Sequence, residues 1–360
     1  MGNWQFTLIF HNLPVAEPIG NNTIRIVSID DPLVAKIRSR SEEFCQFIDS
    51  FKDQFGRSSN PSVLFFNTDI KPDIESLVSF RNILAISSIS RAWARYLSHG
   101  SQLEYLKYSD YFDFYPYSLS SDEKYLIAQT PSVTSLDEAK SFSGQPSPGI
   151  AKAHSLRNFY DTSLFNGLLA KWNELFIKKR SRNWELIALF RSLEMAYRAS
   201  ALPFGNQGTI HDYGASISLW TSAFEILIHP QNKHVGVKDV IEMLGTIYFC
   251  NRKLHYKKYR VKIGNKIEWL TIVQKTYFEM HCARNNFLHG NPVTLKMLFP
   301  GGNKKYPALN FCAPIIYKYA LEKFIGLNKE VNLLELSEIS EYMTHRNNEE
   351  ALVNIRKEIK

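Results

Sequence analysis

The chain has 360 residues, of which 44% are hydrophobic and 13% are aromatic. This composition excludes a disordered chain, and the length favours two domains over one. The net charge of +8 is divided unevenly, because residues 1–150 hold 13 Lys and Arg against 17 Asp and Glu, a net of −4, so residues 151–360 carry +12. The first part of the chain is therefore acidic and the second part strongly basic.

The first residues indicate neither a signal peptide nor a membrane span, because an apolar run of five residues follows no positively charged region. The cysteines are widely spaced and form no CxxC pair, which fits neither a disulfide framework nor a zinc site. They are Cys45, Cys250, Cys282 and Cys312. We expect a cytoplasmic protein with reduced thiols and no membrane partner.

Strand and helix signals alternate in the first part of the chain. Residues 4–10, 22–29 and 62–68 are rich in β-branched and aromatic residues, as strands are. Residues 41–55 and 73–97 place apolar side chains at helical spacing behind an acidic or hydroxyl start. Two further strands are expected within 110–119 and 124–130.

A linker is expected at residues 141–149, where the sequence SFSGQPSPG has the Ser, Gly and Pro content of a connecting segment. We therefore predict a mixed α+β domain over residues 1–140. A second domain is expected over residues 150–360.

Strand signals nearly vanish in the second domain, where apolar residues recur at helical spacing. Helices are predicted around residues 186–197, 219–227, 237–249, 268–288, 308–326 and 333–358. Such a series predicts an all-α antiparallel helical bundle with one long basic insertion between its third and fourth helices.

The insertion is residues 252–266, which hold seven basic residues and no acidic residue, with two tyrosines interleaved. This pattern is typical of a surface that faces a polyanion. The alternative is a solvated basic loop without a ligand. The candidate RNA-binding residues are Arg252, Lys253, Lys257, Lys258 and Arg260.

The sequence HCARNNFLHGNP at residues 281–292 is the candidate functional motif. The preceding helix is expected to end near Leu288, with Gly290 supplying a left-handed stop and Pro292 preventing continuation. Arginine and histidine in the last turn of a helix also complement its dipole and cap its carbonyls. The alternative to an active site is therefore a helix cap with a purely structural role.

At about 100° per residue, Asn285 and His289 lie roughly 40° apart on one face of such a helix, and Arg284 about 100° from Asn285. A cation, an amide and an imidazole would therefore lie together at the end of the helix. Such a set of side chains is suited to binding a phosphate group. Imidazole exchanges protons near neutral pH, and guanidinium neutralises charge that develops on a phosphorane. Cleavage of RNA by its own 2′-hydroxyl needs no metal, but it needs two proton-transfer groups, which a symmetric dimer would supply.

RNNFLH fits the R-N-x-x-x-H signature of the HEPN superfamily, and residues 219–228 (LWTSAFEILI) resemble the partner helix of its Apea-like subgroup. The resemblance covers about residues 150–325. It implies a dimeric, metal-independent endoribonuclease of a prokaryotic antiphage defence or toxin system, with Arg284 and His289 catalytic and Asn285 supporting. The basic insertion departs from a minimal bundle of this family.

Glu225 is the other residue that stands out, because its helix neighbours are apolar and a buried carboxylate needs a partner. Arg284 is the candidate partner. The alternative is an exposed glutamate on the outer face of the helix.

No cofactor or metal is expected, because the sequence has no GxxxxGK[ST] or GxGxxG loop and no HxxxH or HExxH pair. The first hypothesis is an endoribonuclease that binds RNA as a homodimer, with a regulatory or recognition partner engaging the N-terminal domain. The second is a catalytically inactive RNA-binding or scaffold module of the HEPN type. A DNA-binding regulator lacks a helix-turn-helix signal.

Overall fold

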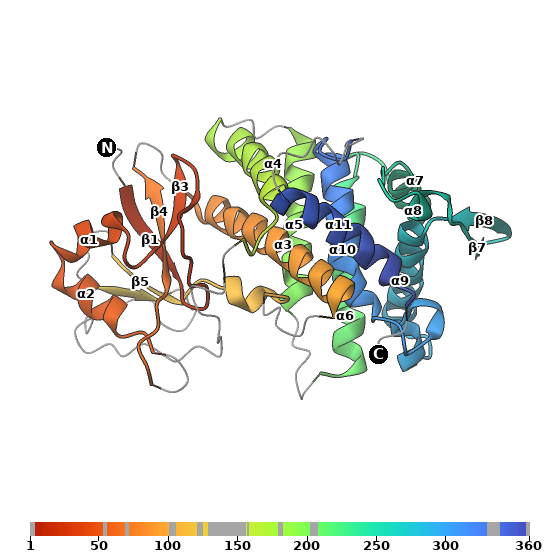
Figure 1. Cartoon of the computed structure of the whole chain (residues 1–360), viewed down its shortest axis with the longest axis horizontal. Coiled ribbons are helices and arrows are strands. Elements are labelled where there is room, and N and C mark those ends of the chain that lie inside the picture. Colours follow the sequence, from red (N-terminus) through yellow and green to blue (C-terminus); the bar gives the residue numbers. More distant parts are fainter. Residues whose placement is uncertain are drawn as a thin grey trace. The chain divides into compact units, whose positions relative to one another are not determined.

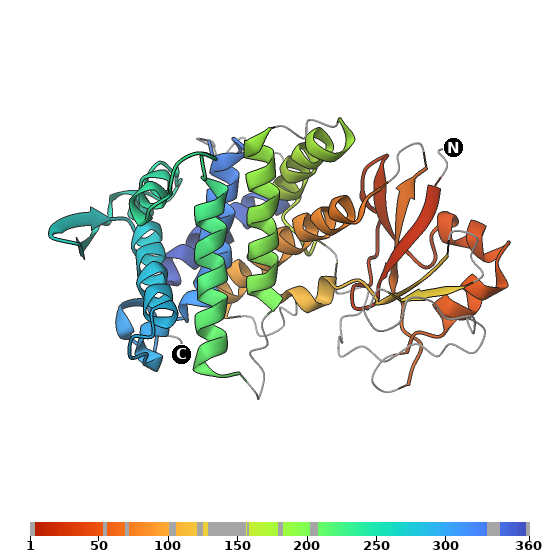
Figure 2. The same ribbon diagram turned by 180° about the vertical axis from the view of Figure 1, so that it is seen from behind.

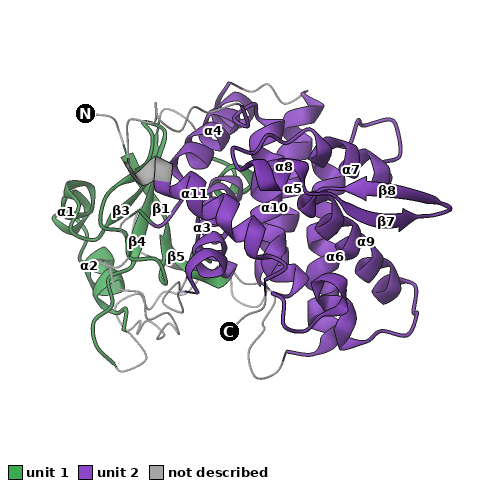
Figure 3. Cartoon of the chain, turned by 45° about the vertical axis from the view of Figure 1, so that its right-hand side comes forward, with its two compact units in different colours: residues 1–77, 110–158 green, residues 78–109, 159–360 purple. Residues whose placement is uncertain are grey.

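The computed structural model describes residues 4–52, 56–68, 72–100, 106–120, 125–128, 156, 158–178, 183–201, 208–329 and 339–357. The chain divides into two compact units (Figure 3). The N-terminal unit comprises Met1–Leu77 and Asp110–Asn158, and the helical unit comprises Val78–Ser109 and Phe159–Lys360. Residues 78–109 thus group with the helices rather than with the N-terminal strands, and the expected linker lies outside the described residues.

The N-terminal unit is built on a four-stranded antiparallel sheet in the order β1-β4-β3-β2 (Figure 1). Its strands are β1 (Trp4–Phe10), β2 (Ile19–Gly20), β3 (Ile24–Ser28) and β4 (Ser62–Asn67). Helices α1 (Pro32–Arg38) and α2 (Glu42–Asp49) begin at the capping side chains Asp31 and Ser41. Their apolar side chains share a core with the sheet, in which Phe6 contacts Phe44 edge to face.

A second, two-stranded ladder of the N-terminal unit pairs β5 (Tyr117–Leu119) with β6 (Leu126–Ala128). It joins β1 through the hydroxyl of Ser118, which donates to the carbonyl of Thr7 at 2.8 Å. The strands predicted at 4–10, 22–29, 62–68 and 124–130 are confirmed. The one predicted within 110–119 is restricted to its last residues, because Ser109–Phe112 form a 3-10 turn.

The helical unit follows the predicted periodicity closely. Its helices are α3 (Ile74–His99, the first turn of which belongs to the N-terminal unit), α4 (Thr162–Trp172), α5 (Trp184–Ala201), α6 (Ile210–Leu227), α7 (Val237–Gly245), α8 (Arg252–Tyr256), α9 (Ile272–Leu288), α10 (Leu309–Phe324) and α11 (Ile339–Asn354). A π-helical turn, Asn173–Ile177, extends α4, and short 3-10 turns at Leu295–Leu298 and Pro300–Gly302 connect α9 to α10.

Helix α6 lies at the centre of this unit, in contact with α5, α9 and α10, and Figure 2 shows it between α5 and α9. Its buried Phe224 contacts the rings of Tyr277 on α9 and Tyr317 on α10 at 5.2 and 5.3 Å between centroids. Trp220, one turn earlier, contacts the same Tyr317 ring. This aromatic core holds α9 against α6.

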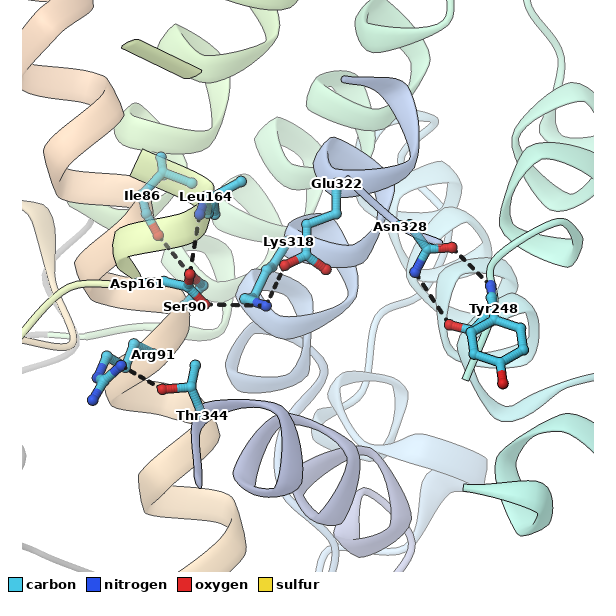
Figure 4. Close-up of polar contacts among 10 residues, drawn as sticks. All are labelled: Ile86, Ser90, Arg91, Asp161, Leu164, Tyr248, Lys318, Glu322, Asn328 and Thr344. Atoms are coloured by element: carbon cyan, nitrogen blue, oxygen red, sulfur yellow. Dashed lines mark hydrogen bonds and ion pairs between the residues drawn. The ribbon is translucent and has the colours of Figure 1, made fainter. Parts of the chain in front are cut away.

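A buried charged cluster stabilises the unit on the other side of α10 (Figure 4). The ammonium of Lys318 lies 2.6 Å from a carboxylate oxygen of Glu322 and 3.2 Å from one of Asp161, which also caps α4. Burial alone would raise the pKa of Asp161, but the nearby Lys318 holds that pKa below its ordinary value. Arg91 of α3 donates to the hydroxyl of Thr344, which ties α11 to α3.

The prediction of an all-α second domain is wrong in one place. The basic insertion contains α8 and an antiparallel hairpin of β7 (Tyr259–Ile263) and β8 (Lys266–Leu270). Residues 268–270, expected at the start of a helix, are therefore strand, and α9 begins after its N-cap Thr271. The chain is mixed α+β in both units.

Candidate functional site

Helix α9 ends as the sequence predicts, on a cap made by the backbone. The amide of His289 donates to the carbonyl of Asn285 at 3.0 Å, and the amide of Asn291 donates to the carbonyl of Asn286 at 3.1 Å. Gly290 between them has a φ of 69°, the left-handed conformation of this motif. Because main-chain amides satisfy these carbonyls, the side chains of Arg284 and His289 are not required to cap them.

A connected set of polar side chains lies on the face of α9 that packs against α6. Arg284 places Nη2 3.7 Å from Oε2 of Glu225, and its Nη1 donates to Oδ1 of Asn285 at 3.4 Å. Nδ2 of Asn285 lies 3.0 Å from Nε2 of His281, whose Nδ1 is 3.7 Å from Oε1 of Glu225. Four side chains thus form a closed ring, and the expected pairing of Glu225 with Arg284 is confirmed.

The ring assigns donor and acceptor roles to its members. The amide oxygen of Asn285 faces the guanidinium of Arg284, so its NH₂ group faces His281. Nε2 of His281 lies 3.0 Å from this NH₂ group, and Nδ1 of the same ring lies 3.7 Å from Glu225. One oxygen of Glu225 faces the guanidinium of Arg284 and the other faces the ring of His281, and Asn285 holds the Arg284 fork from the other side.

Burial strengthens these interactions, since the side chains of Glu225, His281 and Arg284 are 19%, 16% and 25% exposed. The alternative of an exposed Glu225 is therefore wrong.

Tyr277, one turn before His281, has a buried hydroxyl with no hydrogen-bond partner among the described residues. Burial, followed by the charge of Glu225, raises the pKa of Tyr277 well above its ordinary value, so the group stays a phenol.

His289 lies apart from this ring. It is the C-cap residue of α9, one helical turn beyond Asn285, and its side chain is exposed. No described residue forms a hydrogen bond or ion pair with its imidazole. The structure therefore joins Arg284, Asn285 and Glu225 and leaves His289 facing solvent at the end of the same helix.

The close approach of α6 to the end of α9 depends on Gly214. A Cβ atom at this buried position would lie 2.3 Å from the nearest ring atom of Phe287. Phe287 also contacts the ring of His211, which lies on α6 like Gly214, with 6.4 Å between the centroids. The absent side chain at Gly214 thus lets Phe287 pack between the two helices and fixes the last turn of α9.

All five candidate RNA-binding residues of the basic insertion are exposed. Arg252 and Lys253 begin α8, Lys257 and Lys258 connect it to the hairpin, and Arg260 lies on β7. The segment is a short helix followed by a paired strand rather than a loop, and its basic side chains face solvent.

His281 is the residue of the ring that the sequence did not single out. Its signal was the spacing from Asn285, four residues on, which places both side chains on one helix face. Tyr277 precedes it by the same interval.

Within the described ranges, no group of three or more His, Cys, Asp or Glu side chains is placed to hold a metal ion. None of the helices the structure describes is long and apolar enough to cross a membrane. Comparisons of the chain with protein-family models, with curated proteins and with solved structures found no match.

Proposed function

We propose that the chain is a metal-independent endoribonuclease of the HEPN type that cleaves RNA through its 2′-hydroxyl. The observation that carries the proposal is the ring of Glu225, His281, Asn285 and Arg284, which fixes a guanidinium five residues before the exposed imidazole of His289. A plain helix cap would not require this ring, because the backbone closes the helix.

In the proposed reaction, the 2′-oxygen forms a bond to phosphorus while the bond from phosphorus to the 5′-oxygen breaks. The 2′-hydroxyl loses a proton and the 5′-oxygen gains one, which leaves a 2′,3′-cyclic phosphate and a 5′-hydroxyl. His289 is the proton-transfer group. Arg284 neutralises charge on the phosphorane, and a planar fork held in place on both sides does so without reorganising.

Asn285 and Glu225 are positioning residues in this scheme, because they contact Arg284 and hold it. His281 is 16% exposed and engaged by Asn285 and Glu225, so it supports the ring rather than meeting substrate. The reaction needs a base and an acid, and residues 284–289 of each chain offer one free imidazole. We therefore propose a two-fold homodimer that brings two copies of residues 284–289 to one cleft.

The second candidate is an RNA-binding or scaffold module of the same type without catalysis. It is favoured by one observation, the pairing of Arg284 with a carboxylate, which lowers its net charge toward a phosphate. In either case the N-terminal unit is proposed to recognise a regulator or substrate, and the setting to be cytoplasmic antiphage defence or a toxin-type system.

Incubation of the purified protein with total cellular RNA in EDTA separates the two candidates. The endoribonuclease cleaves RNA in EDTA, and His289→Ala lowers the rate by about 10²-fold or more. His234→Ala, which removes another exposed imidazole, is the matched control and keeps the rate. Equal rates for wild type and His289→Ala, with both folded by thermal melting, contradict the proposal.

A further inference from the structure

The hairpin of the basic insertion exposes an aromatic and cationic face. The pairs Arg260–Trp269 and Lys262–Ile267 lie directly opposite one another across the strands, so all four side chains are on one face. All four are exposed, and Trp269 and Ile267 are 64% and 52% exposed. Figure 1 shows the hairpin projecting beyond α7 and α8.

The opposite face of the hairpin is the anchored one. It carries Val261, Ile263 and Leu270, all buried, and it also carries the single acid of the two strands, Glu268. The usual arrangement buries the large apolar side chains and exposes the polar ones, so a face on which Trp269 and Ile267 are both exposed is suited to a partner outside the chain.

Tyr259 at the base of β7 fixes the hairpin to the helices. Three cations lie over its ring, namely Lys257, Lys275 of α9 and Arg356, at 5.5, 5.2 and 5.3 Å from the centroid. Nη2 of Arg356 also donates to both carboxylate oxygens of Glu279 on α9, at 2.7 and 2.9 Å. The free face is thus held in a fixed relation to α9.

We propose that this face, formed by Arg260, Lys262, Ile267 and Trp269, binds unpaired segments of RNA, with a nucleobase stacked on Trp269 and phosphates on Arg260 and Lys262. The proposal rests on the proposed function and names its substrate class as single-stranded RNA. Base stacking on an exposed aromatic side chain beside cations is the general mode of single-strand binding.

The charge of the free face distinguishes between its possible ligands, which are single-stranded RNA, a nucleic-acid duplex and a second copy of the hairpin. Residues 252–266 have no acidic side chain, and the free face has none either, which complements a polyanion. A second copy of the hairpin would bring like charges together, so this face does not pair with itself. A duplex keeps its bases stacked inside, so it could use Arg260 and Lys262 but not Trp269.

The position of the face sets the length of RNA required. The hairpin leads directly into α9, whose 17 residues end at the candidate site. At 1.5 Å per residue the helix spans roughly 25 Å, so an RNA held by Trp269 reaches the site only if it is several nucleotides long. Trp269 should therefore matter for long substrates and not for dinucleotides.

Fluorescence anisotropy in EDTA tests the proposal, with a labelled 16-nucleotide RNA that has no internal pairing and the same RNA annealed to its complement. Every variant carries His289→Ala to prevent cleavage. Trp269→Ala should weaken binding of the single strand at least about fivefold and leave the duplex unchanged. Trp269→Phe should stay within about twofold, because phenylalanine also stacks. Ile74→Ala, which trims a side chain that is 60% exposed, is the control.

Replacement of both Arg260 and Lys262 by Gln should lower the slope of log affinity against log salt by roughly 1.4 for the single strand. The proposal is overturned if Trp269→Ala binds like Ile74→Ala, or if single strand and duplex lose affinity equally. It is also overturned if Trp269→Ala retains RNA affinity but changes the mass in light scattering or loses binding to anionic lipid vesicles. Binding is read without cleavage, so failure here differs from failure of the nuclease proposal.

Discussion

Glu225→Gln is the sharpest perturbation of the ring, because it removes one charge and keeps the size of the side chain. Two unit charges separated by 3.7 Å interact by roughly 4 kcal/mol at an effective dielectric constant of 20. Desolvation offsets much of this, and Gln can still accept a hydrogen bond, so about 1–2 kcal/mol of net coupling to Arg284 should be lost.

If that loss falls on the orientation of Arg284, kcat/KM for RNA cleavage should drop about tenfold, and the free energy of unfolding should fall by about 1 kcal/mol. RNA affinity should not fall, because the variant is more positive. The assays are initial rates on a defined RNA and urea denaturation. Glu242→Gln on α7, where the glutamate is exposed, is the charge-matched control. If Glu225→Gln cleaves RNA as fast as Glu242→Gln, Glu225 does not position Arg284.

Three further outcomes are expected. Gly214→Ala should lower both Tm and cleavage rate, because its Cβ would push the ring of Phe287 and displace the last turn of α9; an unchanged rate would show that this turn tolerates the shift. Lys318→Met should reduce the free energy of unfolding by about 3–5 kcal/mol in urea, because it leaves two buried carboxylates uncompensated; a loss below about 1 kcal/mol would contradict the ion-pair account. Light scattering should report twice the 41.6 kDa chain mass at micromolar concentration, and full activity as a monomer would refute the composite cleft.

The sequence predicted the end of α9 because local rules determine it. Gly290 is the residue that adopts a left-handed φ at lowest cost, and Pro292 cannot continue a helix. The pairing of Glu225 with Arg284 was also predictable, since a carboxylate on an apolar helix face needs a partner. These inferences depend on single elements or on one necessary contact.

The hairpin was missed because seven positive charges concealed its alternation. Tyr259, Val261 and Ile263 recur every second residue before Gly264, whose φ of 59° makes the tight turn. The charges between them occupy the exposed positions of a strand. The alternation is therefore present in the sequence.

The grouping of residues 78–109 with the helical unit could not be predicted, because it depends on contacts between distant segments. Trp93 of α3 stacks on Phe311 of α10 with 4.4 Å between centroids, and Ser87 accepts a backbone hydrogen bond from Asp161. No local pattern pairs these residues. The same holds for Gly214 and Phe287, whose fit sets how closely two helices approach.

The central claim is that the 2′-hydroxyl is the nucleophile and the protein supplies the proton transfer without a metal. The most direct measurement is cleavage, in EDTA, of a mapped substrate in which only the ribose at the cleaved position is 2′-deoxy. The account predicts that the unmodified RNA is cut to a 2′,3′-cyclic phosphate and a 5′-hydroxyl, while the 2′-deoxy substrate binds equally well and stays intact at that position. Cleavage of the 2′-deoxy substrate at the same position, or products that bear a 5′-phosphate, would contradict it.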